Sequence, residues 1–344
     1  MLISRKPLFD RQSSFGPLAR LLVASEGEQA LQRLFRVAGA IVAPERPKDP
    51  VAFAGMSRLF ELAARLMGDE AFGFRVGAGM SPSEFGRFAD FAFDAPSLRM
   101  GIHRAGRLSG LQNNALKLAL DDTGSEAIWS LNYRREVASS CYHHAVHSMP
   151  AMMGLLKRFV GPRAMPTRID VAMPPFRGAS LLEDLAGVPV WSGAGRFAIV
   201  FPAAWLDAAV TRRPGGAAIM TTSDVFSYYT DRLPDTTAEA LSIVMEPILE
   251  EGDLSLDRLA SILGLSRRKI QRDLNADGIR FRDMLLAARM KRAQRLMLEG
   301  PEPIVQIALA VGYSDQSHFH RAFTAHVGAA PGRWRVAMGR REGV

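Results

Sequence analysis

One short helical pattern occurs twice in the last quarter of the chain, and it constrains the fold more than any other feature. The first copy spans residues 259–274 and the second spans 307–323. In each copy an aliphatic residue and an alanine open a short apolar helix, and a glycine ends it. A serine or aspartate then starts a new helix with an apolar-x-Arg-x-apolar run. These are the usual stop and start signals of helices, so the pattern predicts two helix-turn-helix units.

Net positive charge is confined to the same part of the chain. The 344 residues carry a formal net charge of +8. From Ser266 onward, fifteen Lys and Arg residues stand against seven Asp and Glu, and residues 1–265 carry 28 of each sign. Those arginines lie inside apolar-periodic helices and not in one solvated run. This placement favours a nucleic-acid footprint over a basic tail.

Polar side chains suited to base edges share one face of each predicted second helix. In the first copy, Arg268, Gln271 and Arg272 stand at i, i+3 and i+4, while Ile270 and Leu274 point toward the core. Arg can donate two hydrogen bonds to guanine, and Gln can pair in the same way with adenine. The residues that we expect to contact bases are Arg268, Gln271, Arg272, Gln316, Ser317, His320 and Arg321.

The predicted helix between the two copies, of about seventeen residues, would span roughly 25 Å. Successive major-groove segments on one face of B-DNA lie about 34 Å apart, so one subunit could bridge them with some bending and read a bipartite site. Phosphate contacts are expected from Arg267, Lys269, Arg280 and Arg282. The alternative is two helical hairpins that merely pack together, with arginines for solubility. The repeated turn, cap and polar face favour two DNA-reading units.

Residues before the duplicated region show mixed helix and strand patterns. Helices are expected at 19–37, 57–67, 97–108 and 137–160. Strands are expected at 116–120, 128–133, 169–172, 188–191 and 196–201. The last two strands are expected to form a hairpin, because a Ser-Gly-Ala-Gly turn at 192–195 separates them. The lead-in at 1–18 is expected to be mobile.

These patterns predict three parts. An α+β domain occupies residues 1–210, and a linker with one short helix near Phe226 occupies 211–235. An all-α domain with the two helix-turn-helix motifs occupies 236–340.

The sequence lacks the motifs of disulfide-rich proteins, of several enzyme classes and of a complete metal site. The single cysteine, Cys141, excludes an intramolecular disulfide framework. Gly-x-Ser-x-Gly, His-Glu-x-x-His and a phosphate-binding loop with lysine are absent from the sequence, so we predict no enzyme, no catalytic residue and no cofactor. His143 and His147 have a chelating spacing, but no carboxylate or second cysteine completes a metal set. Solvent-facing polar residues are the favoured interpretation, with no metal.

The C-terminal residues resemble a known family. Residues 259–274 and 307–335 are similar to the DNA-binding domain of AraC/XylS transcription regulators, especially at Gly312-Tyr313, His318-Phe319, Arg321-Ala322-Phe323 and Trp334-Arg335. The resemblance places the expected base-contacting residues on both recognition helices. Two departures are Asp273, where the family usually has an apolar or neutral residue, and Ala330, where Ser or Thr is usual.

The N-terminal part carries a second resemblance, at 85–98 and 189–202, to a branch of that family with an arabinose-binding-type domain. This resemblance implies a small-molecule effector and dimerisation, with amino acids, fatty acids, sugars and cyclic dinucleotides all open. We select Arg134 and Trp191 as candidate effector-binding residues. Five arginines could gather around an anion, namely Arg134, Arg135, Arg158, Arg163 and Arg168, although paired surface arginines are the favoured interpretation.

The expected function is therefore ligand-responsive transcription regulation, as an activator. We expect a cytoplasmic homodimer that binds double-stranded DNA, a small-molecule effector and RNA polymerase, with no membrane partner. The alternative is a ligand-independent or architectural DNA-binding protein. The large charge-neutral N-terminal part argues against that class, because architectural proteins use most of their surface on DNA.

Overall fold

The computed structural model describes residues 6–40, 46–209, 220–229, 231–251 and 254–339. The chain divides into two compact units. The N-terminal unit is Leu8–Leu233, and the C-terminal unit is Pro234–Val344 together with Met1–Pro7. The first unit is mixed α and β and the second is helical, so the predicted fold classes are confirmed. No helix among the described residues is both long enough and apolar enough to cross a membrane.

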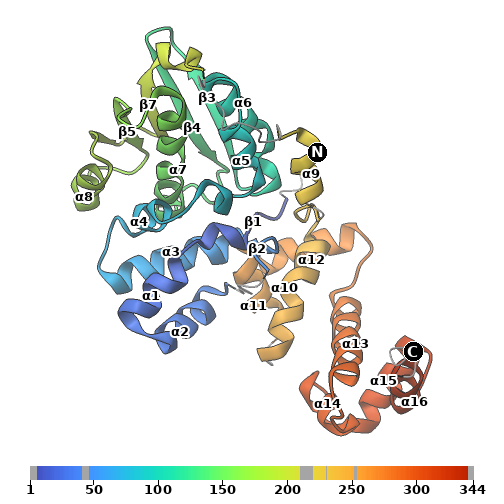
Figure 1. Ribbon diagram of the computed structural model, residues 1–344. Coiled ribbons are helices and arrows are strands. Elements are labelled where there is room, and N and C mark those ends of the chain that lie inside the picture. Colours follow the sequence, from blue (N-terminus) through green and yellow to red (C-terminus); the bar gives the residue numbers. More distant parts are fainter. Residues whose placement is uncertain (1–5, 41–45, 210–219, 230, 252–253, 340–344) are drawn as a thin grey trace. The chain divides into compact units, whose positions relative to one another are not determined.

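Among its described residues, the N-terminal unit contains nine α-helices, four short 3-10 helices and seven strands. The elements are drawn in Figure 1. Its helices are α1 (Leu18–Glu26), α2 (Glu28–Ala38), α3 (Phe53–Met67), α4 (Phe72–Ala78), α5 (Arg87–Phe93), α6 (Leu98–Leu108), α7 (Tyr142–Val160), α8 (Arg177–Ala186) and α9 (Thr222–Tyr228). Its strands are β1 (Phe9–Arg11), β2 (Pro50–Ala52), β3 (Leu116–Asp122), β4 (Glu126–Tyr133), β5 (Arg168–Val171), β6 (Val190–Ser192) and β7 (Phe197–Pro202).

Five strands form one sheet in the order β3-β4-β7-β5-β6. The predicted hairpin of β6 with β7 is wrong, because β6 pairs in parallel with β5 and β7 lies on the other side of β5. The glycine-rich turn after β6 is held to the β5 segment instead, where Ala194 donates its N–H to the carbonyl of Val171 at 3.1 Å. Gly193 and Gly195 both adopt positive φ. The predicted turn is therefore present, but it does not join two paired strands.

One face of the sheet packs against α6 and α7 and forms the main core. Trp129, Leu131 and Ile199 alternate along β4 and β7 with side chains buried on this face. Along α7, Val146 and Met149 are also fully buried. Ser97 is the N-cap of α6, and its hydroxyl accepts the N–H of Met100.

The helices α1 to α4 form a second core, and α4 crosses α7 at close range. Gly73 and Gly77, one turn apart on α4, lie directly against the backbone carbonyls of His143 and His147. A Cβ at either glycine would overlap those carbonyls, so only glycine permits this approach. The sequence pattern showed neither α4 nor α5.

The expected mobile lead-in is wrong from Leu8 onward. Phe9, Asp10 and Arg11 form β1, pair with β2, and are at most 2% exposed. Arg11 is held by carbonyl acceptors on three distant segments, at Lys48, Leu111 and Asp231. These contacts satisfy a buried guanidinium and fix the start of the unit.

Part of the expected linker lies outside the described residues, at 211–219 and 230. The short helix expected near Phe226 is present as α9. Its Val225 and the following Tyr229 are buried with Phe91 and Leu108, so this stretch packs on the N-terminal unit. The boundary between the units falls after Leu233.

The C-terminal unit contains seven helices among its described residues: α10 (Thr237–Glu251), α11 (Leu256–Leu263), α12 (Arg267–Ala276), α13 (Phe281–Glu299), α14 (Ile304–Ala310), α15 (Gln316–Val327) and α16 (Pro331–Gly339). Helix α10 contacts α11, α12 and α13. Glu246 of α10 forms ion pairs of 3.0 Å with Lys291 and Arg295 of α13. Helices α13, α14 and α15 share a core that contains Met290, Phe319 and Phe323.

Candidate functional site

Helices α11 and α12 form the first helix-turn-helix. Gly264 ends α11 at a φ of +63°, and the hydroxyl of Ser266 accepts the N–H of Lys269 to cap α12. On α12, Ile270 and Leu274 are buried. The residues expected to contact bases, Arg268, Gln271 and Arg272, are exposed. Local signals in the sequence therefore place this polar face on the outside of the unit.

Helices α14 and α15 repeat this arrangement. Gly312 turns the chain at a φ of +86°, and the carboxylate of Asp315 accepts the N–H of His318 at 2.7 Å to cap α15. Phe319 and Phe323 are fully buried. The other expected base-contacting residues are all exposed on α15, namely Gln316, Ser317, His320 and Arg321. The connecting helix α13 has 19 residues, so it is about 28 Å long.

Asp273, the acidic departure on α12, joins this helix to α10. Its carboxylate accepts a hydrogen bond from the hydroxyl of Thr237 at 2.7 Å and one from the ammonium of Lys269. Partial burial by itself would raise the pKa of Asp273, but these hydrogen bonds hold that pKa below its ordinary value. The expected phosphate contact by Lys269 is at odds with this arrangement, because its side chain is only 12% exposed and pairs with Asp273. Of the other expected phosphate contacts, Arg282 is exposed on α13.

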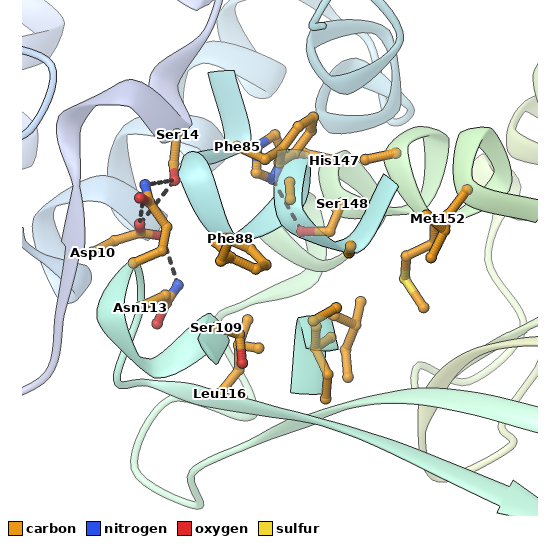
Figure 2. A pocket seen from close by; sticks show the side chains of 18 of the residues that line it. Asp10, Ser14, Phe85, Phe88, Ser109, Asn113, Leu116, His147, Ser148 and Met152 are labelled. Carbon is orange, nitrogen blue, oxygen red and sulfur yellow. Dashed lines mark hydrogen bonds between the residues drawn. The ribbon is translucent and has the colours of Figure 1, made fainter. Parts of the chain in front are cut away.

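The N-terminal unit contains a cavity of about 80 Å³ between α5, α6, α7 and strands β3 and β4. Apolar side chains such as Phe88, Leu116 and Met152 line most of it. Asp10 and Asn113 lie together at one end, opposite Met152 (Figure 2). The cavity is therefore largely apolar with one polar end, which is the usual character of a small-molecule site.

Asp10 is the centre of the polar end. Its carboxylate accepts hydrogen bonds from Ser14 at 2.8 Å and from Asn113 at 2.6 Å, and lies 2.9 Å from Nε2 of His144. On its other side, Nδ1 of His144 lies 2.7 Å from the hydroxyl of Tyr133. Because a carboxylate only accepts, Nε2 of His144 donates to it, and Nδ1 accepts the Tyr133 proton. The network is therefore satisfied without any contribution from a ligand.

Burial favours the neutral forms of His143 and His147 at pH 7. Burial lowers the pKa of His143 to about 4. Burial, with a smaller contribution from His144, lowers the pKa of His147 to about 3. The carbonyl of His144, the charge of Asp10 and the carbonyl of Ser14 oppose this only in part. The interpretation of these histidines as solvent-facing is wrong, since both are at most 6% exposed. No group of three or more His, Cys, Asp or Glu residues in the described ranges has a metal-binding arrangement.

Both units of the chain match known protein families. Residues 29–210 match the family described as the arabinose-binding domain of AraC transcription regulators, N-terminal, and residues 259–337 match a helix-turn-helix domain. The first match alone covers more than half of the chain. The chain belongs to the AraC family of transcription regulators.

Several proteins similar to this AraC-family chain are transcription regulators, and two of the three named here match most of its length. VirS, an HTH-type transcriptional regulator of Mycobacterium tuberculosis, is 25% identical over 84% of this chain and 85% of its own. The ornithine utilization regulator of Pseudomonas aeruginosa is 26% identical over 92% and 93% of the two chains. Transcriptional activator NphR of Rhodococcus is 29% identical over 45% of this chain and 44% of its own. The protein is thus a transcription regulator with an N-terminal ligand-binding domain and a C-terminal DNA-binding domain.

The candidate effector residues of this AraC-family regulator do not line the cavity. Trp191 is 58% exposed on the edge strand β6, and the guanidinium of Arg168 lies 4.3 Å from its ring centre. Arg134 lies just after β4 and has Glu136 at 3.9 Å. Arg168 is paired, as the favoured interpretation expected, with Glu126 and Asp170, but its side chain is only 12% exposed and not on the open surface.

Sequence reasoning missed most residues of the cavity. Trp129, which lies in the strand expected at 128–133, does line the cavity. Asp10 was hidden in the stretch expected to be mobile. A usable signal was present in α7, where His144 and His147 interrupt an otherwise apolar stripe three residues apart. Buried polar residues in such a stripe need partners from other segments, and here those partners include Asp10.

Proposed function

We propose that this regulator reads a bipartite DNA site with α12 and α15 of one subunit, and that a ligand in the N-terminal cavity changes the DNA affinity. The observation that carries the first part is the matching exposure of Arg272 and Arg321. Each occupies the central position of its apolar-x-Arg-x-apolar run, with a buried apolar residue on either side. Equivalent local structures therefore present equivalent arginines for base contact.

The spacing of the two units supports one continuous site. Helix α13 is about 28 Å long, and successive major-groove segments lie about 34 Å apart. Side chains at both ends and modest DNA bending can cover the difference. The exposed Arg282 contributes a phosphate contact that positions the unit without specifying sequence.

The second part of the proposal is supported by the cavity. It lies in the unit that matches a ligand-binding family, and its walls are mostly apolar with one polar end. A ligand that binds one state of the regulator more tightly than another shifts the population toward that state, and typical coupling corresponds to about 1–3 kcal/mol.

The proposal also includes transcription activation, homodimerisation, contact with RNA polymerase and a cytoplasmic location. The activator assignment is supported by the name of the relative NphR, a transcriptional activator. Homodimerisation, contact with RNA polymerase and a cytoplasmic location follow the resemblance, and sedimentation of the full-length protein with and without DNA would measure the first of these.

The test of bipartite reading begins with DNA sequences selected by the full-length protein from a random library. We expect two conserved half-sites about one helical turn apart. Arg272→Ala should relax the preference in one half-site and Arg321→Ala in the other, each with a loss of about 1–3 kcal/mol in specific binding. Arg33→Ala, an exposed site on α2, is the matched control and should leave both unchanged.

Two results would contradict this proposal. One is that both substitutions relax the same base pairs, which would mean that the two helices do not read separate half-sites. The other is that neither substitution alters the selected sequence, which would remove α12 and α15 from base reading altogether.

A further inference from the structure

A second hollow in the N-terminal unit is an open groove between α5, α6 and α9. Helix α9 packs against α5, and α5 packs against α6 (Figure 1). The groove has a volume of about 580 Å³, which lies within the range of about 300–1,000 Å³ that is usual for small-molecule sites. Its lining includes Phe91, Met100, His103, Arg104, Arg107 and Phe226. No described residue lines both this groove and the cavity around Asp10, so the two sites are separate.

The face of α6 that borders the groove carries a basic stripe, which consists of His103, Arg104 and Arg107. His103 and Arg107 stand one helical turn apart, so their Cβ atoms lie about 5–6 Å from each other. Both side chains are exposed, and neither has an ion pair or hydrogen bond with another residue that the structure describes. A molecule in the groove can therefore reach both side chains at once.

Arg104 is fixed at the wall of the groove by Phe91. Its guanidinium donates a hydrogen bond of 3.0 Å to the carbonyl of Phe91 and lies 4.0 Å from the centre of the Phe91 ring. Arg107, three residues further along α6, adds a second permanent positive charge, and like charges at this spacing repel each other. Within the described ranges, no Asp or Glu lines the groove to offset them. The charges of the groove therefore favour an anionic ligand.

Two large apolar side chains in the groove are exposed to water. Phe226 of α9 is 54% exposed and Met100 of α6 is 45% exposed. Met100 shares its face of α6 with the basic stripe, because it precedes His103 by three residues and Arg104 by four. Covering exposed apolar side chains is favourable, and such side chains gathered in a hollow are typical of binding sites. An inorganic anion would leave both uncovered, so the ligand needs an apolar part.

We propose that the groove between α6 and α9 binds an organic carboxylate with an apolar tail. The carboxylate accepts two hydrogen bonds from the guanidinium of Arg107 and one from the ring of His103. The tail packs against Met100 and Phe226. Helix α9 is the last helix before the boundary of the unit at Leu233, so the ligand joins α6 to the segment that leads into the DNA-binding unit. This site is additional to the proposed function, which needs only the cavity and the two recognition helices.

The first experiment uses full-length protein labelled with ¹³C in the methyl groups of its sixteen methionines. Met100 reports on the groove and Met152 on the cavity, and their signals are assigned by their loss in Met100→Leu and Met152→Leu. The probe is sodium octanoate. We expect a saturable shift of the Met100 signal with the Met152 signal unchanged. A saturable shift of Met152 alone, or no saturable shift of either signal, would overturn the proposal.

Two further probes separate the charge of the ligand from its tail. Octylammonium has the same tail as octanoate and the opposite charge, while acetate has the same charge and almost no tail. Both should bind at Met100 much more weakly than octanoate does. Octylammonium of equal affinity would show that the basic stripe does not select the ligand. Acetate of equal affinity would show that the apolar side chains do not contribute, and either result would overturn the assigned class.

The second experiment measures octanoate affinity in variants by calorimetry. Arg107→Gln removes the charge and Phe226→Ala removes the ring, and we expect at least about tenfold weaker binding in each. Both side chains are exposed, so neither substitution removes a buried contact.

The matched control is the double variant Arg33→Gln, Val37→Ala on α2. It removes an exposed arginine and a valine that is 60% exposed, and it should bind octanoate as the wild type does. Circular dichroism of each variant checks that the fold is kept. Unchanged affinity in both groove variants would overturn the proposal, and so would an equal loss of affinity in the control.

Discussion

The hydroxyl of Thr237 on α10 donates a hydrogen bond of 2.7 Å to the carboxylate of Asp273 on α12. The same carboxylate is paired with Lys269, and its side chain is only 9% exposed. Asp273 thus joins the first recognition helix to α10. Its other carboxylate oxygen lies 3.5 Å from the guanidinium of Arg272, which is exposed, as Arg268 is. The acidic residue that departs from the family pattern has a structural role in this protein.

The first prediction concerns that contact. Asp273→Ala should destabilise the attachment of α12 by about 1–3 kcal/mol, because it leaves Lys269 and Thr237 without their partner. Hydrogen exchange of the α12 amides, measured by mass spectrometry, should become faster, and specific DNA affinity should fall. Asp49→Ala removes an exposed pair with Arg46 in the N-terminal unit and should change neither. Unaltered exchange in α12 would show that Asp273 does not hold the helix.

The second prediction concerns the salt dependence of DNA binding. The logarithm of affinity should fall linearly with the logarithm of salt concentration, because phosphate contacts release counterions. Arg282→Ala should reduce that slope by about 1 and weaken all DNA sequences alike. Fluorescence anisotropy at several salt concentrations measures both effects. A change in sequence preference without a change in slope would instead make Arg282 a base-reading residue.

The third prediction concerns the crossing of α4 and α7. Gly77→Ala should destabilise the N-terminal unit by about 1–3 kcal/mol, because the new methyl group would overlap the carbonyl of His147 and force the helices apart. Gly154→Ala on α7 is the matched control, since its methyl group would meet only the ring of Phe93 at 3.6 Å. It should be neutral or stabilising. Urea unfolding followed by circular dichroism distinguishes the two, and equal midpoints would contradict the close packing.

The fourth prediction concerns acid stability. His143 and His147 have folded pKa values of about 4 and about 3, below the ordinary value, so the unfolded chain binds more protons in this range. The free energy of unfolding that the two neutral histidines contribute is fully present above about pH 6.5. It is lost as the pH falls toward those folded pKa values, at about 1.4 kcal/mol per pH unit for each histidine. Unfolding free energies between pH 7 and pH 5 should show this decline.

Substitution separates these histidines from other acid effects. His147→Gln should flatten the decline between pH 6 and pH 5 relative to the wild type. His103→Gln changes an exposed histidine on α6 and should leave the decline as it is. An identical pH slope in His147→Gln would show that His147 is not the neutral buried group described here.

Local patterns predicted some parts of the molecule and not others. The five strands of the main sheet were located to within a few residues, because alternating and short apolar runs mark them directly. The pairing of these strands was not predicted correctly, since β6 pairs with β5 and not with β7, the strand that follows it in sequence. Pairing depends on which edge is free once the rest of the sheet has formed. Trp191 could not be recognised as exposed for the same reason, because it lies on the edge strand.

The sequence alone determined the two helix-turn-helix units and the exposed faces of α12 and α15. Their caps, glycine stops and apolar spacing act within about seventeen neighbouring residues, and local interactions suffice to set them. Only the tertiary structure decided the cavity. Asp10 and His144 are 134 positions apart and meet because buried polar groups require partners, which a folded core supplies from distant segments. No local pattern records which distant residue that will be.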